Sequence, residues 1–166
     1  MKTLFCASLA ALFLIAAAPT ARAAESRIAW RGWDAGLQEA KRLDRPVVVD
    51  VYTQWCGWCK RMDRDVYARP EVREYLASKF VTVKIDAESS DPARFDGRSY
   101  TSRSLAGFFR VTGYPTTLFL RSNGEHLVNV PGYVQADQFL LVLRYIGDGH
   151  LDRGETWEDY KAASKP

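Results

Sequence analysis

The stretch Val47-Val48-Val49-Asp50-Val51-Tyr52-Thr53-Gln54-Trp55-Cys56-Gly57-Trp58-Cys59-Lys60 decides the fold of this chain. Its first half is an apolar run, typical of a strand buried on both faces, and its second half holds a Cys-x-x-Cys pair. A strand that leads through Cys-x-x-Cys into a helix is typical of a thiol–disulfide redox site. We expect Cys56 at the N-terminus of that helix, where free N–H groups and the helix dipole favour a thiolate. Cys59 follows one turn later, close enough to form a small disulfide.

The N-terminal residues 1–23 have the pattern of a secretory signal peptide. Lys2 gives a basic start, Leu4 to Ala18 is apolar, and Ala21-Arg22-Ala23 is a small-x-small cleavage site. The alternative, an uncleaved membrane anchor, is disfavoured because the apolar run is shorter than the roughly 20 residues that a spanning helix needs. We therefore expect cleavage after Ala23 and export to the periplasm.

The remaining residues 24–166 are expected to form a single domain, with a core at about 30–146 and a C-terminal extension at 147–166. The whole chain has 23 basic and 20 acidic residues, and loss of Lys2 and Arg22 with the signal leaves 21 against 20. This balance gives no reason to expect nucleic acid or an anionic membrane as a partner. The sequence shows no obvious interface, and we expect a monomer.

Cys56 and Cys59 are the cysteines that remain after the signal is removed. A pair this close encloses too short a loop to add much stability, which favours a working site over a structural staple. Half of a zinc site is the other alternative, but zinc needs about four ligands, and His126 and His150 are remote in sequence. We expect no metal and no cofactor besides the redox-active Cys56–Cys59 disulfide.

Periodicity and turn signals predict an α/β domain, with a mixed sheet and helices on both faces. Asp34 is the expected N-cap of the first helix, residues 88–104 are expected to be a surface loop, and Gly147 is the expected C-cap of the last helix. The expected helices are 30–43, 56–66, 70–78, 105–111 and 136–146, and the expected strands are 47–52, 80–86, 116–121 and 126–130. A hairpin turn is predicted at Ser122-Asn123-Gly124.

Three stretches together carry a family resemblance. Residues 47–60 resemble the thioredoxin active-site region, Gly113-Tyr114-Pro115-Thr116 resembles that family's cis-proline loop, and Asn123-Gly124-Glu125 with Pro131-Gly132 resembles its terminal hairpin. The resemblance extends over about 30–146 and implies a thioredoxin fold, with a central mixed β-sheet flanked by helices. The chain is most similar to exported bacterial thioredoxin-like proteins, which resemble periplasmic thiol–disulfide interchange proteins.

Two positions depart from the family pattern. Trp58 stands where ordinary thioredoxins have proline, and Thr82 stands where they carry a lysine near the buried acid. Lys84, on the same strand face, is the candidate replacement. Because Trp58 adds no cation near the sulfurs, we expect a mildly reducing protein.

Cys56 is the candidate nucleophile and is expected to be the exposed sulfur. Cys59 is the candidate resolving cysteine, which attacks Cys56 in the mixed disulfide and releases reduced substrate. Asp50 interrupts an apolar strand, so burial is expected to raise its pKa, and it is the candidate proton acceptor for Cys59. The alternative is an acid at the strand edge that reaches solvent.

Candidate substrate-binding residues surround the cysteines. The resemblance implies that Pro115 is a cis proline, which leaves the backbone of Tyr114 free to pair with an extended substrate. Trp55 and Trp58 are expected to form an aromatic collar for client chains, although Trp55 alternatively packs under the helix. Gly57 allows close approach of a substrate backbone.

These observations predict an exported thiol–disulfide oxidoreductase that reduces or reshuffles disulfides in client proteins. The resemblance implies recharging by a membrane electron donor. The alternatives are a thiol oxidase or isomerase, and a thioredoxin-fold module that binds clients without turnover. The sequence identifies neither the client nor the direction of the reaction.

Overall fold

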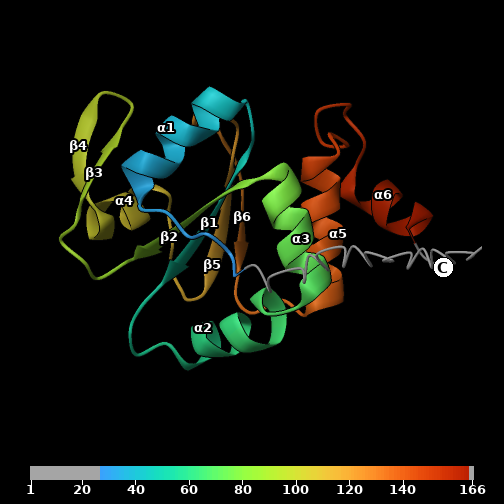
Figure 1. Cartoon of the computed structure of the whole chain (residues 1–166), viewed down its shortest axis with the longest axis horizontal. Helices are drawn as coiled ribbons and strands as arrows, with labels where there is room; N and C mark the ends of the chain where they lie inside the picture. The colour runs from blue at the N-terminus through green and yellow to red at the C-terminus, as the bar shows by residue number, and fades with distance from the viewer. Residues whose placement is uncertain (1–26, 165–166) are drawn as a thin grey trace, which may run out of the picture.

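A computed structural model describes residues 27–164 of the chain (Figure 1). The predicted signal peptide and its cleavage site lie outside these residues. Within the described part, no helix combines the length and the apolar character needed to cross a membrane.

The centre of the molecule is a four-stranded mixed sheet with the order β2-β1-β5-β6. Its strands are β1 (Val47–Tyr52), β2 (Val81–Asp86), β5 (Thr116–Leu120) and β6 (His126–Pro131). β1 runs parallel to β2 and antiparallel to β5, and β5 and β6 form an antiparallel hairpin. The predicted mixed sheet is therefore confirmed, with β1 as a buried inner strand.

Helices cover both faces of this sheet (Figure 1). The helices of one layer are α1 (Trp33–Leu43) and α4 (Ser102–Phe108), and those of the other are α3 (Pro70–Lys79) and α5 (Ala136–Gly147). Side chains of β1 alternate between the two cores: Val47, Val49 and Val51 pack on the α1 side, and Val48 packs on the α5 side. The same period places Asp50 on the α5 side, facing the helix that follows the cysteines.

The helix after the cysteines is not regular. It consists of α2 (Gly57–Met62) and a π-helical turn, η1 (Asp63–Tyr67), where the sequence predicted one helix over 56–66. Cys56 is the N-cap of α2, as expected. The wider turn brings Val66 and Tyr67 into the core on the α5 side.

The first helix begins three residues later than predicted, at Trp33. The residues before it are extended along β2: the Arg31 N–H donates to the Thr82 carbonyl at 3.0 Å, and the Lys84 N–H donates to the Arg31 carbonyl at 3.0 Å. The prediction of Asp34 as the N-cap was wrong, because Gly32 holds that position. The Asp34 carboxylate instead accepts a hydrogen bond from the Arg94 backbone N–H at 2.7 Å.

The prediction of a surface loop at 88–104 was also wrong. This segment contains a hairpin of β3 (Pro92–Phe95) and β4 (Arg98–Thr101), followed by the start of α4. Asp96 and Gly97 turn the hairpin with φ values of 49° and 70°, the left-handed conformation that two-residue hairpin turns require. The Asp-Gly pair was a usable hairpin signal, but the strands beside it are short and polar.

The prediction of Gly147 as the C-cap of the last helix was wrong, because Gly147 is the last residue of α5. Asp148 is the C-cap, and a Cβ at Gly147 would lie 2.9 Å from the Phe80 ring, so glycine allows close packing there. The chain then forms α6 (Trp157–Ala163). Tyr145 of α5 contacts the rings of Trp157 and Tyr160 at 5.4 and 5.3 Å, so α6 packs back on the domain.

Candidate active site

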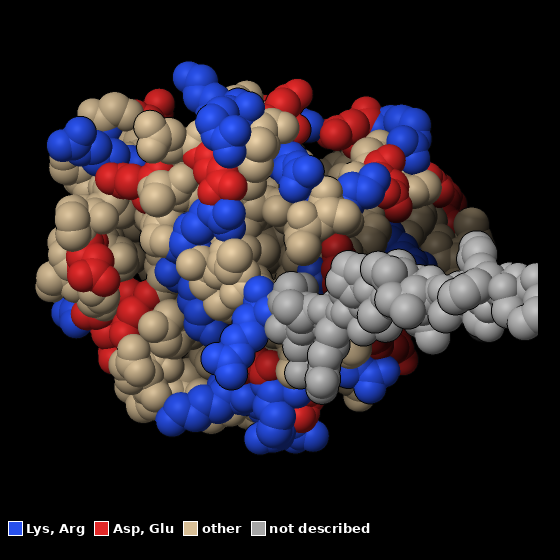
Figure 2. All heavy atoms as spheres, in the orientation of Figure 1, with Lys and Arg blue, Asp and Glu red and all other residues tan. Residues whose placement is uncertain are grey.

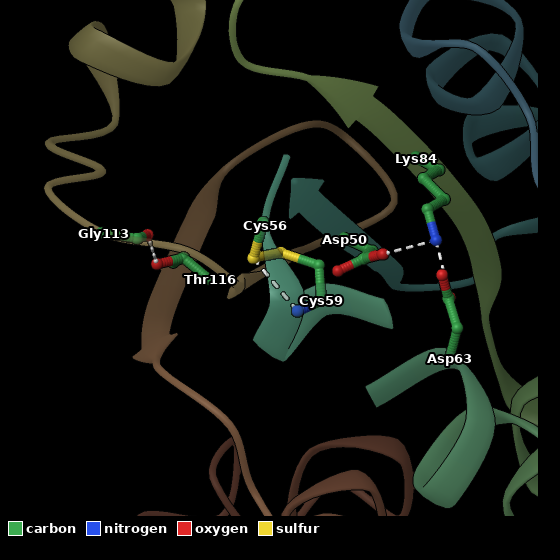
Figure 3. Close-up of a disulfide and its surroundings, with 7 residues drawn as sticks. All are labelled: Asp50, Cys56, Cys59, Asp63, Lys84, Gly113 and Thr116. Carbon is green, nitrogen blue, oxygen red and sulfur yellow. Dashed lines mark hydrogen bonds and ion pairs between the residues drawn. A yellow bond between two sulfur atoms is a disulfide. The ribbon is translucent and has the colours of Figure 1, made fainter. Parts of the chain in front are cut away.

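The Cys56–Cys59 pair lies between the end of β1 and the start of α2, and it is a disulfide in this structure (Figure 3). The Cα atoms of the two cysteines are 5.3 Å apart. The Cys59 backbone N–H donates to Cys56 Sγ at 3.0 Å. A reduced Cys56 thiolate is stabilised by a donor in that position, because the same N–H meets a full negative charge.

Cys56 is not the exposed residue that the sequence predicted. Cys56 and Cys59 are 2% and 4% exposed, whereas Trp55 and Trp58 are 66% and 54% exposed. One tryptophan immediately precedes each cysteine in the sequence, and both tryptophans are exposed to solvent. This confirms an exposed aromatic collar and contradicts the alternative that Trp55 packs under the helix.

Each collar tryptophan contacts a tyrosine from another part of the chain. The Trp55 ring meets Tyr114 edge-on at 6.0 Å, and the Trp58 ring meets Tyr133 at 5.5 Å. The Arg61 guanidinium lies over the rings of Trp58 and Tyr133, 5.2 and 5.4 Å from their centres. Tyr133 was missed by sequence reasoning, because only the fold brings it beside α2.

The loop that precedes β5 lies opposite the disulfide (Figure 3). The Tyr114–Pro115 peptide bond is cis, as the resemblance implied. Thr116 Oγ1 donates to the Gly113 carbonyl at 2.8 Å and closes this turn. At Gly57 a Cβ would meet no atom within 4 Å, so the space beside this position is open.

Asp50 is 2% exposed, which excludes an acid at the strand edge that reaches solvent. One carboxylate oxygen is 3.0 Å from Lys84 Nζ, and the other, Oδ1, has no hydrogen-bond partner. Burial raises the pKa of Asp50 above its ordinary value, although the Lys84 ammonium opposes the shift. In Figure 3 this carboxylate lies between the disulfide and Lys84.

Lys84 lies beside the buried Asp50, as the sequence suggested. Contacts with an acid and with aromatic rings hold its ammonium group there. Its Nζ is 2.6 Å from Asp63 Oδ1, and it lies over the ring of Tyr52 at 5.0 Å and the ring of Trp30 at 5.3 Å. Burial disfavours the charged ammonium, but the two carboxylates outweigh this effect, so the pKa of Lys84 is raised.

Asp63 is the second site residue that the sequence did not identify. Asp63 is half exposed, and its carboxylate is paired with Lys84. A usable signal was present, since Asp63 follows Cys59 by four positions and therefore lies one turn along the same helix face.

The two histidines lie away from the cysteines. His126 hydrogen-bonds Asn129 at 2.6 Å, and His150 pairs with Glu155 at 2.6 Å. Among residues 27–164, no group of three His, Cys, Asp or Glu side chains is placed to hold a metal ion.

Charge around the site is mixed. Figure 2 shows Lys and Arg interspersed with Asp and Glu over the face in view, with basic side chains gathered at its lower edge, where Figure 1 places α2. Lys60 and Arg61, in the last turn of α2, are exposed there.

Comparison with known proteins identifies the same region. Residues 33–147 match the family model of the thioredoxin-like domain. The thiol:disulfide interchange protein DsbD of Haemophilus ducreyi is 33% identical over 101 residues, which is 60% of this chain and 16% of that protein. The chain thus spans about a sixth of the length of that curated relative.

Solved structures show the fold independently. A thioredoxin from Thermus thermophilus superposes with a TM-score of 0.63 and 25% identity, covering 78% of this chain and 95% of that one. A putative disulphide-isomerase from Bacteroides thetaiotaomicron gives a TM-score of 0.57 and 31% identity, covering 71% of this chain and 91% of that one. With its thioredoxin fold and its Cys-x-x-Cys disulfide, this chain belongs to the thioredoxin-like family.

Proposed function

We propose that this protein is an exported thiol–disulfide oxidoreductase that reduces disulfides in client proteins. The observation that carries the proposal is the Cys56–Cys59 disulfide at the N-terminus of α2, with the buried Asp50 carboxylate on the adjoining strand. The chain's similarity to proteins named for thiol:disulfide interchange supports the same chemistry.

The reaction begins with both cysteines reduced. The Cys56 thiolate attacks one sulfur of a client disulfide; a Cys56–client disulfide forms, and the second client sulfur leaves as a thiolate that takes up a proton. Cys59, once deprotonated, attacks Cys56 Sγ and displaces the first client sulfur. The client gains two electrons and two protons, and the protein is left with the Cys56–Cys59 disulfide.

Asp50 suits the deprotonation of Cys59. A carboxylate with an ordinary pKa is a weak base for a thiol, but burial raises the pKa of Asp50 and makes its carboxylate a stronger base. Its Oδ1 has no hydrogen-bond partner and is free to take up a proton, while Lys84 holds the other oxygen at 3.0 Å.

The collar supplies the client-binding surface. Trp55 and Trp58 are more than half exposed, which gives flat apolar surfaces beside the sulfurs. The backbone of Tyr114, next to cis-Pro115, is placed for pairing with an extended client segment. Because Cys56 is only 2% exposed, we infer that a client must displace part of the collar to reach it.

The reducing direction rests on what surrounds Cys56. Its described hydrogen bond is the single N–H of Cys59. Lys84 and Arg61 are paired with Asp50, Asp63 and Asp65, and Lys60, which forms no ion pair among the described residues, is exposed to solvent. A weakly stabilised thiolate favours the oxidised protein and hence a reducing potential. We infer a membrane electron donor as the source of reducing equivalents, and the signal-like residues 1–23 support export.

Trapping of the mixed disulfide tests this proposal. Cys59→Ser leaves the nucleophile but removes the resolving thiol, so the reduced variant is expected to accumulate a covalent adduct with insulin as a disulfide-bearing probe. The matched variant Cys56→Ser is expected to form less than about a tenth as much adduct, because Cys56 is the sulfur at the N-cap of α2, where a backbone N–H stabilises its thiolate. The adducts are counted by intact-mass spectrometry after acid quenching.

Two results would overturn the proposal. Equal adduct yields from both variants would mean that Cys56 is not the preferred nucleophile. Absence of any adduct, with insulin bound non-covalently by the wild type, would leave a client-binding module without turnover.

A further inference from the structure

A cavity of about 890 Å³ lies at the end of the central sheet opposite the disulfide. The register places Leu120 beside Val47, the first residue of β1, so the β5–β6 turn that lines the cavity is remote from Cys56. The other walls come from α1, the β3–β4 hairpin and the end of α4, which lie together on the left of Figure 1. The cavity is therefore separate from the site proposed above.

One wall of the cavity is a cluster of aromatic rings. Phe95 contacts Phe108 at 5.6 Å and Phe109 at 5.1 Å between ring centres, and Phe109 contacts His126 at 5.4 Å. Phe108 is 48% exposed, so part of its ring faces solvent at the cavity. These rings are inclined to one another by 57° to 88°, and they give the cavity an apolar aromatic wall.

Hydrogen bonds between distant elements hold this wall in place. Trp33 Nε1 donates to the Arg94 carbonyl at 3.0 Å and ties β3 to α1. Asn129 Nδ2 donates to the Phe109 carbonyl at 2.7 Å and ties β6 to the end of α4. The cavity is thus formed before any ligand arrives, which is typical of small-molecule sites.

The side chains that line the cavity carry an excess of positive charge. Lys41, Arg94 and Arg110 line it, and within residues 27–164 none of them forms an ion pair. Two acids also line it, but Glu125 is paired with Arg121 at 3.1 Å, which leaves Asp96 at the hairpin turn. Three unpaired cations against one unpaired acid favour an anionic occupant.

The backbone at Arg110 has a conformation that is uncommon for its residue type. Its φ is 55°, just after the end of α4, in the left-handed conformation that glycine normally occupies at helix ends. A long cationic side chain there costs about 1 kcal/mol relative to glycine. The side chain at this position lines the cavity.

We propose that this cavity binds a small organic anion with a planar apolar body. The rings of Phe95, Phe108 and Phe109 cover the apolar body, and the guanidinium groups of Arg94 and Arg110 pair with its carboxylate or sulfonate. The volume falls within the range of about 300 to 1,000 Å³ that is usual for ligand sites. This inference does not depend on the function of the disulfide.

Anilinonaphthalene sulfonate, an aromatic monoanion whose fluorescence rises on binding, is a suitable probe. Titrated into the folded, oxidised protein, it is expected to bind saturably with one molecule per chain. The double variant Arg94→Gln/Arg110→Gln is expected to weaken binding about tenfold, roughly threefold for each charge removed. The matched variant Arg98→Gln lies on the same hairpin outside the cavity and is expected to leave the affinity unchanged.

Two further titrations separate this cavity from other apolar surfaces. Phenylnaphthylamine, the neutral analogue, is expected to bind more weakly and equally to the wild type and the double variant. Trp58→Ala tests whether the collar is the true site. Loss of binding in Trp58→Ala but not in the double variant, or no saturable binding at all, would overturn the proposal. Circular dichroism and thermal unfolding establish that each variant is folded.

Discussion

Asp50 is the residue of this site whose burial is least favourable for the stability of the fold. It is 2% exposed, and one of its oxygens has no hydrogen-bond partner. Its ion-pair partner, Lys84, is also paired with Asp63. Burial raises its pKa, which means that the folded protein binds this proton more readily than the unfolded chain does. The ionised carboxylate therefore lowers the stability of the fold, and the proposed chemistry explains why it is present.

This cost predicts a pH-dependent gain in stability for Asp50→Asn. The contribution of Asp50 to the stability of the wild type falls as pH rises above about 4, the ordinary pKa of aspartate, through the raised pKa of Asp50. Asp50→Asn is expected to raise the free energy of unfolding by about 1 to 3 kcal/mol at pH 8, with a smaller gain at pH 5. Urea unfolding at both pH values measures the difference.

The control is Asp65→Asn on the neighbouring helix turn. The side-chain hydrogen bond from Arg64 lowers the pKa of Asp65, so this carboxylate stabilises the fold above its ordinary pKa, and its loss is expected to add no stability. In the wild type the pKa of Lys84 is raised above its ordinary value, so Lys84 stays charged at both pH values. A gain for Asp50→Asn that is equal at pH 5 and pH 8 would contradict a raised pKa.

The same substitution is expected to slow the resolving step. Without the carboxylate, Cys59 must lose its proton to water, so release of client from Cys56 slows on the order of 100-fold at pH 7. Rapid acid quenching and alkylation measure the decay of the mixed disulfide. The difference is expected to shrink above about pH 8.5, where a thiol ionises unaided. Equal rates at pH 7 would remove Asp50 from this role.

At the scale of the element, the sequence predicted the strands β1, β2, β5 and β6 and the helix α5 nearly to the residue, because their apolar periodicity is strong. It failed at residues 88–104, where the hairpin strands are short and mostly exposed, so that no alternation marks them. It also missed η1, since a π-helical turn depends on packing rather than on a local pattern.

The hairpin turn carries a prediction that depends on backbone conformation alone. Gly97→Ala is expected to lower the free energy of unfolding by about 1 kcal/mol, because alanine is disfavoured at a φ of 70°. Gly107→Ala, within α4, is expected to raise it by about 0.4 to 1 kcal/mol. An added Cβ meets no atom within 4 Å at either position, so packing does not distinguish them. Effects of the same sign in urea unfolding would contradict the assigned turn.

At the scale of the whole molecule, the candidate site combines local and tertiary contributions. Cys56, Cys59 and Asp50 were predictable because one strand–helix junction carries them. Tyr133 and Asp63 were not identified, since their roles come from contacts made across the fold, to Trp58 and to Lys84. Lys84 was predictable only as a replacement, by its position on the strand face beside Asp50.

The most direct test of the redox function is a titration of the Cys56–Cys59 pair in dithiothreitol or glutathione buffers of known potential. The mature protein is equilibrated, quenched with acid and alkylated, and the reduced fraction is read by mass. We expect one reversible two-electron transition at a reducing potential, near the thioredoxin value of about −270 mV. A potential close to that of oxidants, about −120 mV, would reverse the proposed direction, and a pair that does not cycle would contradict the redox function itself.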